Sequence, residues 1–453
     1  MPKAQSQAEQ AFDQVVDWLE HFEPLDDPRQ SGKVWYRLDE VLLLCLLAVL
    51  AGAESWVEVA EFGKRKLTFL RRFRSFENGT PSHDQLGDLF AALDAEQFQR
   101  CFITWAGSLA TLGPDLVAID GKTLRRSYQE GGGKAPIHMI SAWANRQRLV
   151  LGQIKVADKS NEITAIPDLL DLLTLKGSTV TIDAMGCQRE IAAKIIEKEA
   201  DYVLALKGNQ GTLREDVELF FNEQAAAGFK DVVVSRHETL EKSHGRLETR
   251  HYTAIDDIDW LKERHDWPGL KSVVMVESVR EIISKKTKPE TETRFYISSL
   301  AAGAETQGEA IRGHWGVENS HHWVMDMLFR DDECRIRKDN APANFATIKH
   351  MAGNVLRQAP GKQSLRVKRR LAAWDDEFLV PSRLWWGIGS SVISGLFNEP
   401  NRPARTGRWR SRHDHRTSIC RYCQGQRRGT GRRRSSGATS DQAEAACAAA
   451  DRR

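Results

Sequence analysis

Two apolar runs in this chain each lead directly into an aspartate. Residues 116–119 precede Asp120, and residues 178–182 precede Asp183. Short apolar runs of this kind predict buried strands, so each aspartate is expected at or near a strand end. Two carboxylates on adjacent strands repel each other unless a cation lies between them, and a hard divalent metal ion with oxygen ligands suits that position. Two solvated acids at strand ends are the alternative interpretation.

A third acidic side chain, Glu318, falls in a segment with helical periodicity. Three apolar residues at i, i+7 and i+11 form its expected buried stripe: Val317, Val324 and Leu328. Glu318 lies at the edge of this stripe, with His314 and His322 one turn to either side. Three carboxylates would hold two Mg²⁺ ions about 4 Å apart, which activate a water or a 3′-hydroxyl for in-line phosphoryl transfer. An ordinary amphipathic helix with an exposed glutamate is the alternative.

The chain before these acids predicts helices only. Ser82 is expected to cap one of them. The helical segments expected from periodicity and turn residues are 11–30, 37–62, 84–93 and 95–112. Residues 1–112 therefore form a predicted all-helical N-terminal domain.

Strand patterns begin after residue 113. Strands are expected at 116–120, 137–144, 148–157, 178–183 and 201–206, with helices at 161–173 and 187–199. This order of three hairpin-like strands, helix, strand, helix and strand predicts an α/β sheet with mixed strand directions. Four further strands, at 231–236, 246–254, 271–280 and 292–299, predict a β-rich insertion at about 228–302 within a domain of 113–379. Helices are expected at 308–329, 342–358 and 364–373.

Charge is distributed unevenly along the chain. The net charge of +3 combines a balance of +10 in residues 381–453 with −7 in residues 1–380. A nucleic-acid function for the body would therefore need a local basic patch. Residues 380–453 are rich in Arg, Gly and Ser, which predicts a disordered tail; out-of-frame translation of the end of the gene is the interpretation that we favour.

Cysteine usage and hydropathy indicate the compartment. Seven cysteines without framework spacing predict reduced thiols and a cytoplasmic setting. The longest apolar run, 41–53, is too short to span a bilayer, so no membrane association is expected.

Several stretches together carry a resemblance to a known family. They are AIDGK at 118–122, DKSNEI at 158–163, TIDAMGCQ at 181–188, LKGNQ at 206–210 and HWGVEN at 314–319, joined in the helical front end by 27–29, 51–52 and 81–84. Through them the chain resembles the H-repeat-associated (ISAs-type) transposases, which are DDE insertion-sequence transposases. The resemblance covers about 12–379 and implies an RNase H-like catalytic core with a β-rich insertion.

The resemblance also implies roles for particular residues. Asp120, Asp183 and Glu318 would be the catalytic triad that binds two Mg²⁺ (or Mn²⁺) ions. The expected partners are double-stranded DNA, both transposon terminal repeats and target DNA, and a second copy of the chain on paired ends in a bacterial cytoplasm. Residues 1–112 would bind the ends. The chain departs from the pattern, since Trp315 and His314 stand where many relatives place Tyr and Arg before the glutamate, and Met325 stands where they place a later Lys.

Nine residues are candidates for DNA contact by position or by resemblance: Lys122, Arg125, Arg126, Lys207, Asn209, Gln210, Arg246, Arg312 and His314. A solvated basic loop, a plain turn or surface strand positions would explain them equally simply. Zinc is a further alternative at two places: one set is Cys420 and Cys423 with His413 and His415, and the other is His321, His322 and Cys334.

Two rival functions remain open from the sequence. An RNase H-like nuclease or resolvase would use the same acids without strand transfer. An inactive or domesticated DNA-binding relic would bind DNA without cutting it. The helical front end and the long insertion favour the transposase reading.

Overall fold

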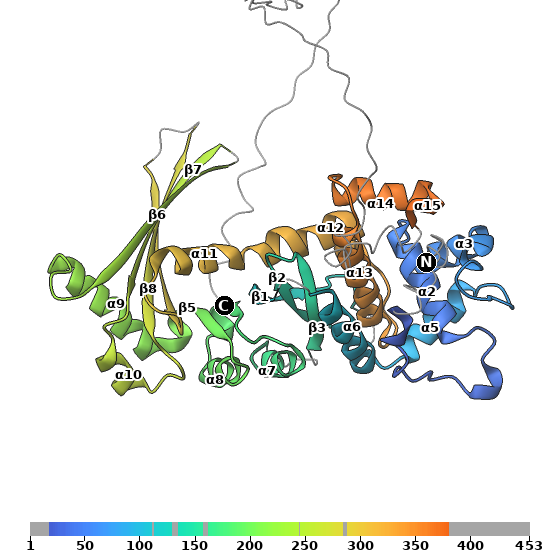
Figure 1. The fold of residues 1–453 in the computed structure, drawn as a ribbon, viewed down its shortest axis with the longest axis horizontal. Coiled ribbons are helices and arrows are strands. Elements are labelled where there is room, and N and C mark those ends of the chain that lie inside the picture. The colour runs from blue at the N-terminus through green and yellow to red at the C-terminus, as the bar shows by residue number, and fades with distance from the viewer. Residues whose placement is uncertain are drawn as a thin grey trace, which may run out of the picture. The chain divides into compact units, whose positions relative to one another are not determined.

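A computed structural model describes residues 18–110, 113–128, 135–156, 162–243, 245–283 and 288–379 (Figure 1). All of these belong to one unit, which extends from Met1 to Leu396. The Arg-rich tail with its Cys420 and Cys423 lies outside the described residues, as do Asp158–Asn161 of the DKSNEI stretch. The expectations of a disordered tail and of zinc there stay predictions.

The N-terminal region is helical, as expected. Its elements are the 3₁₀ turn η1 (Ser31–Lys33), α2 (Leu38–Leu50), α3 (Trp56–Arg65), α4 (Leu67–Leu70), α5 (His83–Ala92) and α6 (Ala95–Leu109). Ser82 caps α5 in a reciprocal capping box with Gln85, and Asp94 caps α6. These side chains satisfy backbone N–H groups that the first turn leaves without partners.

Two expected helices were wrong in extent. The helix predicted over 37–62 is divided, because Gly52 has a φ of +113° and Ser55 then caps a new helix. The helix predicted over 11–30 is helical in its described part only over residues 18–20 and then breaks into turns before Pro24, whose ring removes a backbone donor.

The first five strands form the predicted mixed sheet. They are β1 (Leu116–Thr123), β2 (His138–Ala144), β3 (Leu149–Val156), β4 (Thr179–Ile182) and β5 (Asp201–Leu206), in the order β3-β2-β1-β4-β5. The first three pair antiparallel, and β4 and β5 run parallel to β1. Helices α7 (Glu162–Leu172) and α8 (Arg189–Glu197) lie below this sheet in Figure 1 and α11 (Ala304–His314) lies above it. The expected RNase H-like α/β core is confirmed.

The β-rich insertion continues the same sheet. Its strands are β6 (Val234–Ser243), β7 (Arg246–Ile255), β8 (Ser272–Ile282) and β9 (Glu290–Ser298), and β9 pairs antiparallel with β5. The complete order is β3-β2-β1-β4-β5-β9-β8-β7-β6. The strand expected at 231–236 begins and ends later than predicted. Helices α9 (Gly211–Ala226) and α10 (Asp259–His265) were missed, although the buried residues of α9 follow a helical i, i+4, i+8 spacing: Leu213, Val217 and Phe221.

The helix expected over 308–329 is three elements. Helix α11 is followed by a π-helix over Val317–His322 and by α12 (Trp323–Phe329). Short 3₁₀ turns occur at η2 (Ala184–Gly186), η3 (Gly208–Gln210) and η5 (Asp331–Glu333), and α13 (Ala341–Gln358), α14 (Leu365–Trp374) and α15 (Asp376–Leu379) end the described chain.

Helix α13 joins the helical region to the sheet through two buried asparagines. Asn344 Nδ2 donates to the carbonyl of Phe90, which lies in α5, at 2.8 Å. Asn354 exchanges two hydrogen bonds of 2.9 Å with the backbone of Val150 in β3. The unpaired edge of β3 is thereby partly satisfied by a helix.

Within the described residues, none of the helices combines the length and apolar character that crossing a bilayer requires.

Candidate catalytic centre

Strand register places Asp120 and Asp183 side by side. Strands β1 and β4 are parallel, and Ile119 pairs with Ile182. Each aspartate is the next residue along its strand direction, so both lie at the same level of neighbouring strands. Ile119 and Ile182 are buried, which anchors the two backbone segments from which the carboxylates extend.

Asp183 begins a tight turn at the carboxyl end of β4, the edge where ligands bind in parallel sheets. Its Oδ1 accepts a hydrogen bond of 3.0 Å from the backbone N–H of Met185. The neighbouring loop after β5 holds this turn, since Asn209 Nδ2 donates to Ala184 O at 2.7 Å and Gln210 Nε2 donates to Cys187 O at 2.8 Å. The amides of these two candidate DNA contacts therefore have a structural use.

Glu318 lies in the π-helix that follows α11. The backbone N–H of Trp323 donates to the carbonyl of Glu318, five residues earlier. Val317, His321 and His322 are buried on one side of this wide turn, and Glu318 is exposed on the other. Single π turns inside α-helices frequently occur at functional sites.

The three acidic groups interact electrostatically. Burial raises the pKa of Asp120 to about 7, against a hydrogen bond from the Gly121 backbone that lowers it, and the charges of Glu162, Glu318 and Asp183 raise it further. The pKa of Glu318 is also raised, first by partial burial and then by Asp183. Each ionised carboxylate thus disfavours the ionisation of the others.

The donor chemistry suits a hard divalent cation. Carboxylate oxygens are the ligands that Mg²⁺ and Mn²⁺ prefer, and a cation would offset the repulsion that raises the pKa of Asp120. Among the described residues, however, no group of three or more His, Cys, Asp or Glu side chains is close enough together to hold a metal ion. The acids therefore lie within electrostatic reach of one another without converging on one point.

Two histidines border the acids. His322 Nδ1 lies 3.5 Å from Asp120 Oδ2, and burial lowers the pKa of His322 to about 4, so this side chain is neutral at pH 7. His314 Nδ1 lies 3.1 Å from Thr181 Oγ1, and burial lowers its pKa as well. Both can serve as neutral hydrogen-bonding groups beside the carboxylates.

The zinc alternative at His321, His322 and Cys334 is wrong for the described structure, which holds no such metal-binding group. His321 is instead fully buried, and its ring stacks on Trp143 with centroids 5.7 Å apart and planes 9° apart. Helix packing explains this histidine.

A cavity of about 530 Å³ opens beside the centre. Asp183, His314 and Glu318 line one side of it, and residues of β5, β9 and the loop after β5 line the other, including Lys207. The cavity gives a ligand direct access to two of the three acids.

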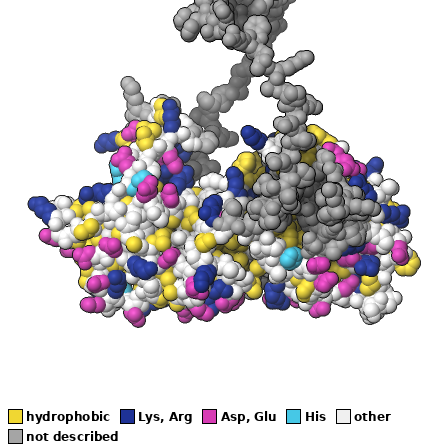
Figure 2. Space-filling view, in the orientation of Figure 1, with side chains coloured by type: hydrophobic (Ala, Val, Ile, Leu, Met, Phe, Trp, Pro, Cys, Tyr) yellow, Lys and Arg dark blue, Asp and Glu magenta, His cyan; other side chains and the backbone are white. Residues whose placement is uncertain are grey.

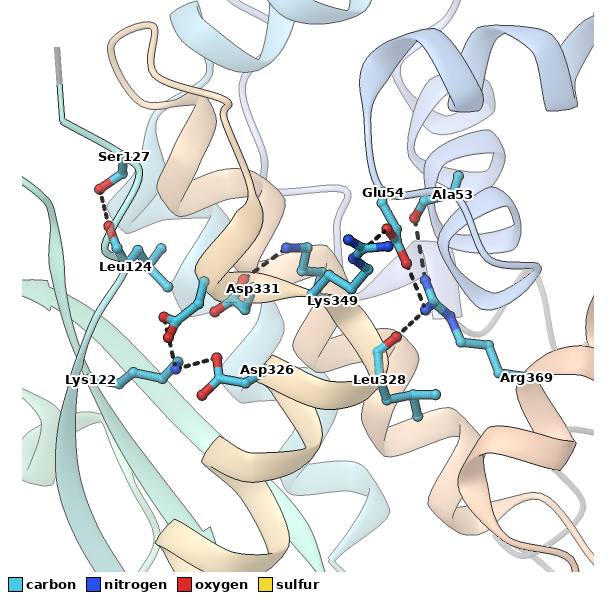
Figure 3. A network of polar contacts seen from close by, with 12 residues as sticks. Ala53, Glu54, Lys122, Leu124, Ser127, Asp326, Leu328, Asp331, Lys349 and Arg369 are labelled. Atoms are coloured by element: carbon cyan, nitrogen blue, oxygen red, sulfur yellow. Dashed lines mark hydrogen bonds and ion pairs between the residues drawn. The ribbon is translucent and has the colours of Figure 1, made fainter. Parts of the chain in front are cut away.

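Most of the candidate basic contacts have protein partners. Lys122 Nζ lies 2.5 Å from Asp326 Oδ1 and 3.5 Å from Asp332 Oδ1 (Figure 3), and Arg312 pairs with Glu241 at 3.1 Å. Arg125 reaches Asp332 only at 3.4 Å and its side chain is 80% exposed. Arg126, Lys207 and Arg246 are also exposed.

The visible surface shows no large field of one sign. On the face drawn in Figure 2, basic and acidic side chains are interspersed over the insertion and the core. Any attraction of DNA to this face has to come from local groups near the centre.

Comparison with known proteins identifies the family. Residues 111–355 match the family model described as "Transposase DDE domain". The chain belongs to the DDE transposase family. Residues 19–106 match the model described as "DDE_Tnp_1-associated", so the helical region is that of a DDE transposase too.

Individual relatives agree with this membership. The Escherichia coli K12 protein named "H repeat-associated putative transposase YhhI" is 42% identical over 369 residues, which cover 80% of this chain and 96% of the relative. The Xanthobacter autotrophicus "Uncharacterized protein in dhlA 3'region" is 45% identical over 290 residues, covering 62% of this chain and 94% of that protein. The cryo-EM structure titled "piggyBac transposase synaptic complex with hairpin DNA" is similar at a TM-score of 0.36 and 10% identity, over 86% of this chain and 80% of that chain.

Membership in the DDE transposase family implies use of a divalent metal and binding of DNA. Sequence reasoning missed two residues beside Asp120, namely Glu162 and His138. Glu162 Oε1 lies 2.6 Å from His138 Nε2. The signal for Glu162 was available, since it stands in the DKSNEI stretch at the start of the helix that follows β3. His138 carries no local signal, because only strand pairing places it next to β1.

Proposed function

We propose that this chain is a DNA transposase that hydrolyses phosphodiester bonds at transposon ends and transfers the freed 3′ ends into target DNA. The observation that carries the proposal is the register of β1 and β4, which sets Asp120 beside Asp183, with Glu318 electrostatically coupled to both. The family of the chain supports this chemistry.

Asp120, Asp183 and Glu318 would hold two Mg²⁺ or Mn²⁺ ions. When bound, these ions supply an activated water or 3′-hydroxyl and stabilise the leaving oxygen of an in-line displacement. The protein contributes the placement of the acids. Sheet register fixes the two aspartates, the η2 turn orients the Asp183 carboxylate through Met185, and the π turn directs Glu318 outward.

The proposed partners are double-stranded DNA, as transposon ends and target, and a second copy of the chain on paired ends. Residues 1–112 are proposed to bind the ends. The exposed basic residues near the centre, Arg125, Arg126, Lys207 and Arg246, are the better candidates for phosphate contact. Lys122 and Arg312 would first have to leave their carboxylate partners.

The test offers the purified chain its transposon ends and a target plasmid with Mg²⁺. The expected products are nicked or cut ends and joined target molecules. Asp120→Asn, Asp183→Asn and Glu318→Gln are each expected to reduce cutting at least about a thousandfold, because ligand loss removes transition-state stabilisation of several kcal/mol. Asp168→Asn, which removes an exposed acid from α7, is the matched control.

The rival functions give other products. Cut ends without joined molecules would indicate a nuclease without strand transfer. Binding of the ends without any cutting by the wild-type chain would indicate a relic. Undiminished cutting by all three variants would show that the acids are not catalytic.

A further inference from the structure

Glu162 and His138 form a pair directly beside the first aspartate. Glu162 is the first residue of α7, and its Oε1 lies 2.6 Å from Nε2 of His138 on β2. On the other side of the ring, His138 Nδ1 lies 2.9 Å from Oγ1 of Thr123, its cross-strand partner on β1. Both ring nitrogens are thereby engaged, which fixes the orientation of the imidazole.

The pair occupies space that Gly121 leaves open. A Cβ atom built on Gly121 would lie 2.2 Å from Glu162 Oε1 and 2.3 Å from His138 Nε2. Gly121 does not need glycine for a positive φ, so the close approach of these two side chains is the reason that a larger residue does not fit. The Glu162 carboxylate therefore lies against the backbone of the residue next to Asp120.

Glu162 is also coupled to Asp120 by charge. Of the acidic neighbours that raise the pKa of Asp120, Glu162 has the largest effect, ahead of Glu318 and Asp183. A carboxylate whose only role is to anchor α7 to β2 would bring an unnecessary repulsion to this place, because a neutral glutamine could accept the same hydrogen bond from His138.

We propose that Glu162 is a fourth carboxylate of the catalytic centre, which binds a divalent cation together with Asp120 while His138 holds it over Gly121. The inference rests on the proposed metal-dependent function. Two divalent cations carry four positive charges, and a fourth carboxylate balances them where the triad alone supplies three. His138 takes the part of a supporting residue, whose hydrogen bond orients a ligating group.

The first test measures Mn²⁺ binding to the full chain without DNA, by the loss of the free-ion electron paramagnetic resonance signal. Glu162→Gln is expected to weaken binding at least about tenfold, the range in which residues at metal sites act. Asp168→Asn removes the same charge from the exposed face of the same helix and is expected to bind Mn²⁺ as the wild type does. Glu162→Gln with wild-type affinity would overturn the inference.

Asp183→Asn separates this inference from the proposed function. If Asp183→Asn loses Mn²⁺ binding and end cutting while Glu162→Gln keeps its Mn²⁺ affinity, only the fourth carboxylate fails. If Asp183→Asn keeps both, the proposed function fails as well.

Thermal unfolding distinguishes metal binding from a structural role. Without metal, Glu162→Gln is expected to melt at or above the wild-type Tm, because a repulsive charge beside Asp120 is removed. With Mn²⁺, its rise in Tm is expected to be smaller than that of the wild type, since stabilisation by a ligand depends on affinity. A lowered Tm without metal together with an undiminished Mn²⁺ response would assign Glu162 a structural role and overturn the proposal.

Discussion

The backbone N–H of Trp323 donates to the carbonyl of Glu318, five residues before it. The chain around the third acid is therefore a π turn where a continuous α-helix was expected. Immediately before it, Gly316 lies against β1 and β2: an added Cβ would be 1.9 Å from Asn145 Oδ1. The position of Glu318 thus depends on close contact between this helix and the sheet.

Gly316→Ala is expected to lower the free energy of unfolding by about 1–3 kcal/mol, the usual cost of overpacking, and to impair end cutting. The Asn145 side chain cannot yield freely, because it accepts from Trp143 Nε1 at 3.2 Å and donates to Leu116 O at 3.3 Å. Urea denaturation and the cutting assay measure both effects.

The control for this substitution is Gly107→Ala. Gly107 lies in α6 with no neighbouring atom near an added Cβ, so alanine there is expected to stabilise the helix by up to about 1 kcal/mol. Equal behaviour of the two variants would contradict the contact between Gly316 and the sheet.

A second prediction concerns the buried ion pair between Asp331 and Lys349, whose nitrogen and oxygen atoms are 2.8 Å apart (Figure 3). Lys349→Met is expected to destabilise the chain by about 3–5 kcal/mol, because it leaves a buried carboxylate without its partner. Adding Asp331→Leu to this variant is expected to restore much of the loss. Denaturant unfolding of the two variants provides the measurement.

The matched control for that pair is on the surface. Lys338 and Asp88 are 2.6 Å apart but both are well exposed, so Lys338→Met is expected to change stability by less than about 1 kcal/mol. A loss as large as that of Lys349→Met would mean that burial is not what makes the Asp331 pair important.

The pKa of Asp120 predicts a pH dependence of the metal-free protein. Its folded value of about 7 is above the ordinary value of 3.8, so between these values the folded state binds the proton more tightly than the unfolded state does. Stability from this group is present at low pH and is lost as the pH rises from about 4 to about 7, by roughly 2–4 kcal/mol. Asp120→Asn is expected to remove that part of the dependence in urea unfolding measured at pH 5 and pH 8 without divalent ions; an unchanged pH profile would contradict the raised pKa.

A fourth prediction separates structural from DNA-contacting cations. Lys122 is enclosed by Asp326 and Asp332, whereas the side chain of Arg125 is 80% exposed. Arg125→Gln is expected to weaken DNA binding and to reduce the slope of log K against log salt by about 1. Lys122→Met is expected to leave that slope unchanged and to lower stability instead. Fluorescence anisotropy with labelled DNA at several salt concentrations decides, and the reverse assignment of slopes would show that Lys122 is the phosphate contact.

Much of the local structure followed from the sequence. The apolar runs before Asp120 and Asp183 predicted the strands that the structure contains, and Ser82 predicted the start of α5. These features depend on interactions between residues a few positions apart, such as side-chain alternation and capping. The order of strands and helices also predicted a mixed sheet, because chain connectivity restricts how such elements pair.

Tertiary structure alone decided the rest. The pairing of Lys122 with Asp326, the contact of Glu162 with His138 and the π turn at Glu318 join or place residues by packing between distant segments. No periodicity in the chain encodes them, because each depends on which helix lies on which face of the sheet and on the space left there, as at Gly121. The sequence by itself determined which acids end which strands; the folded chain decided which charges meet them.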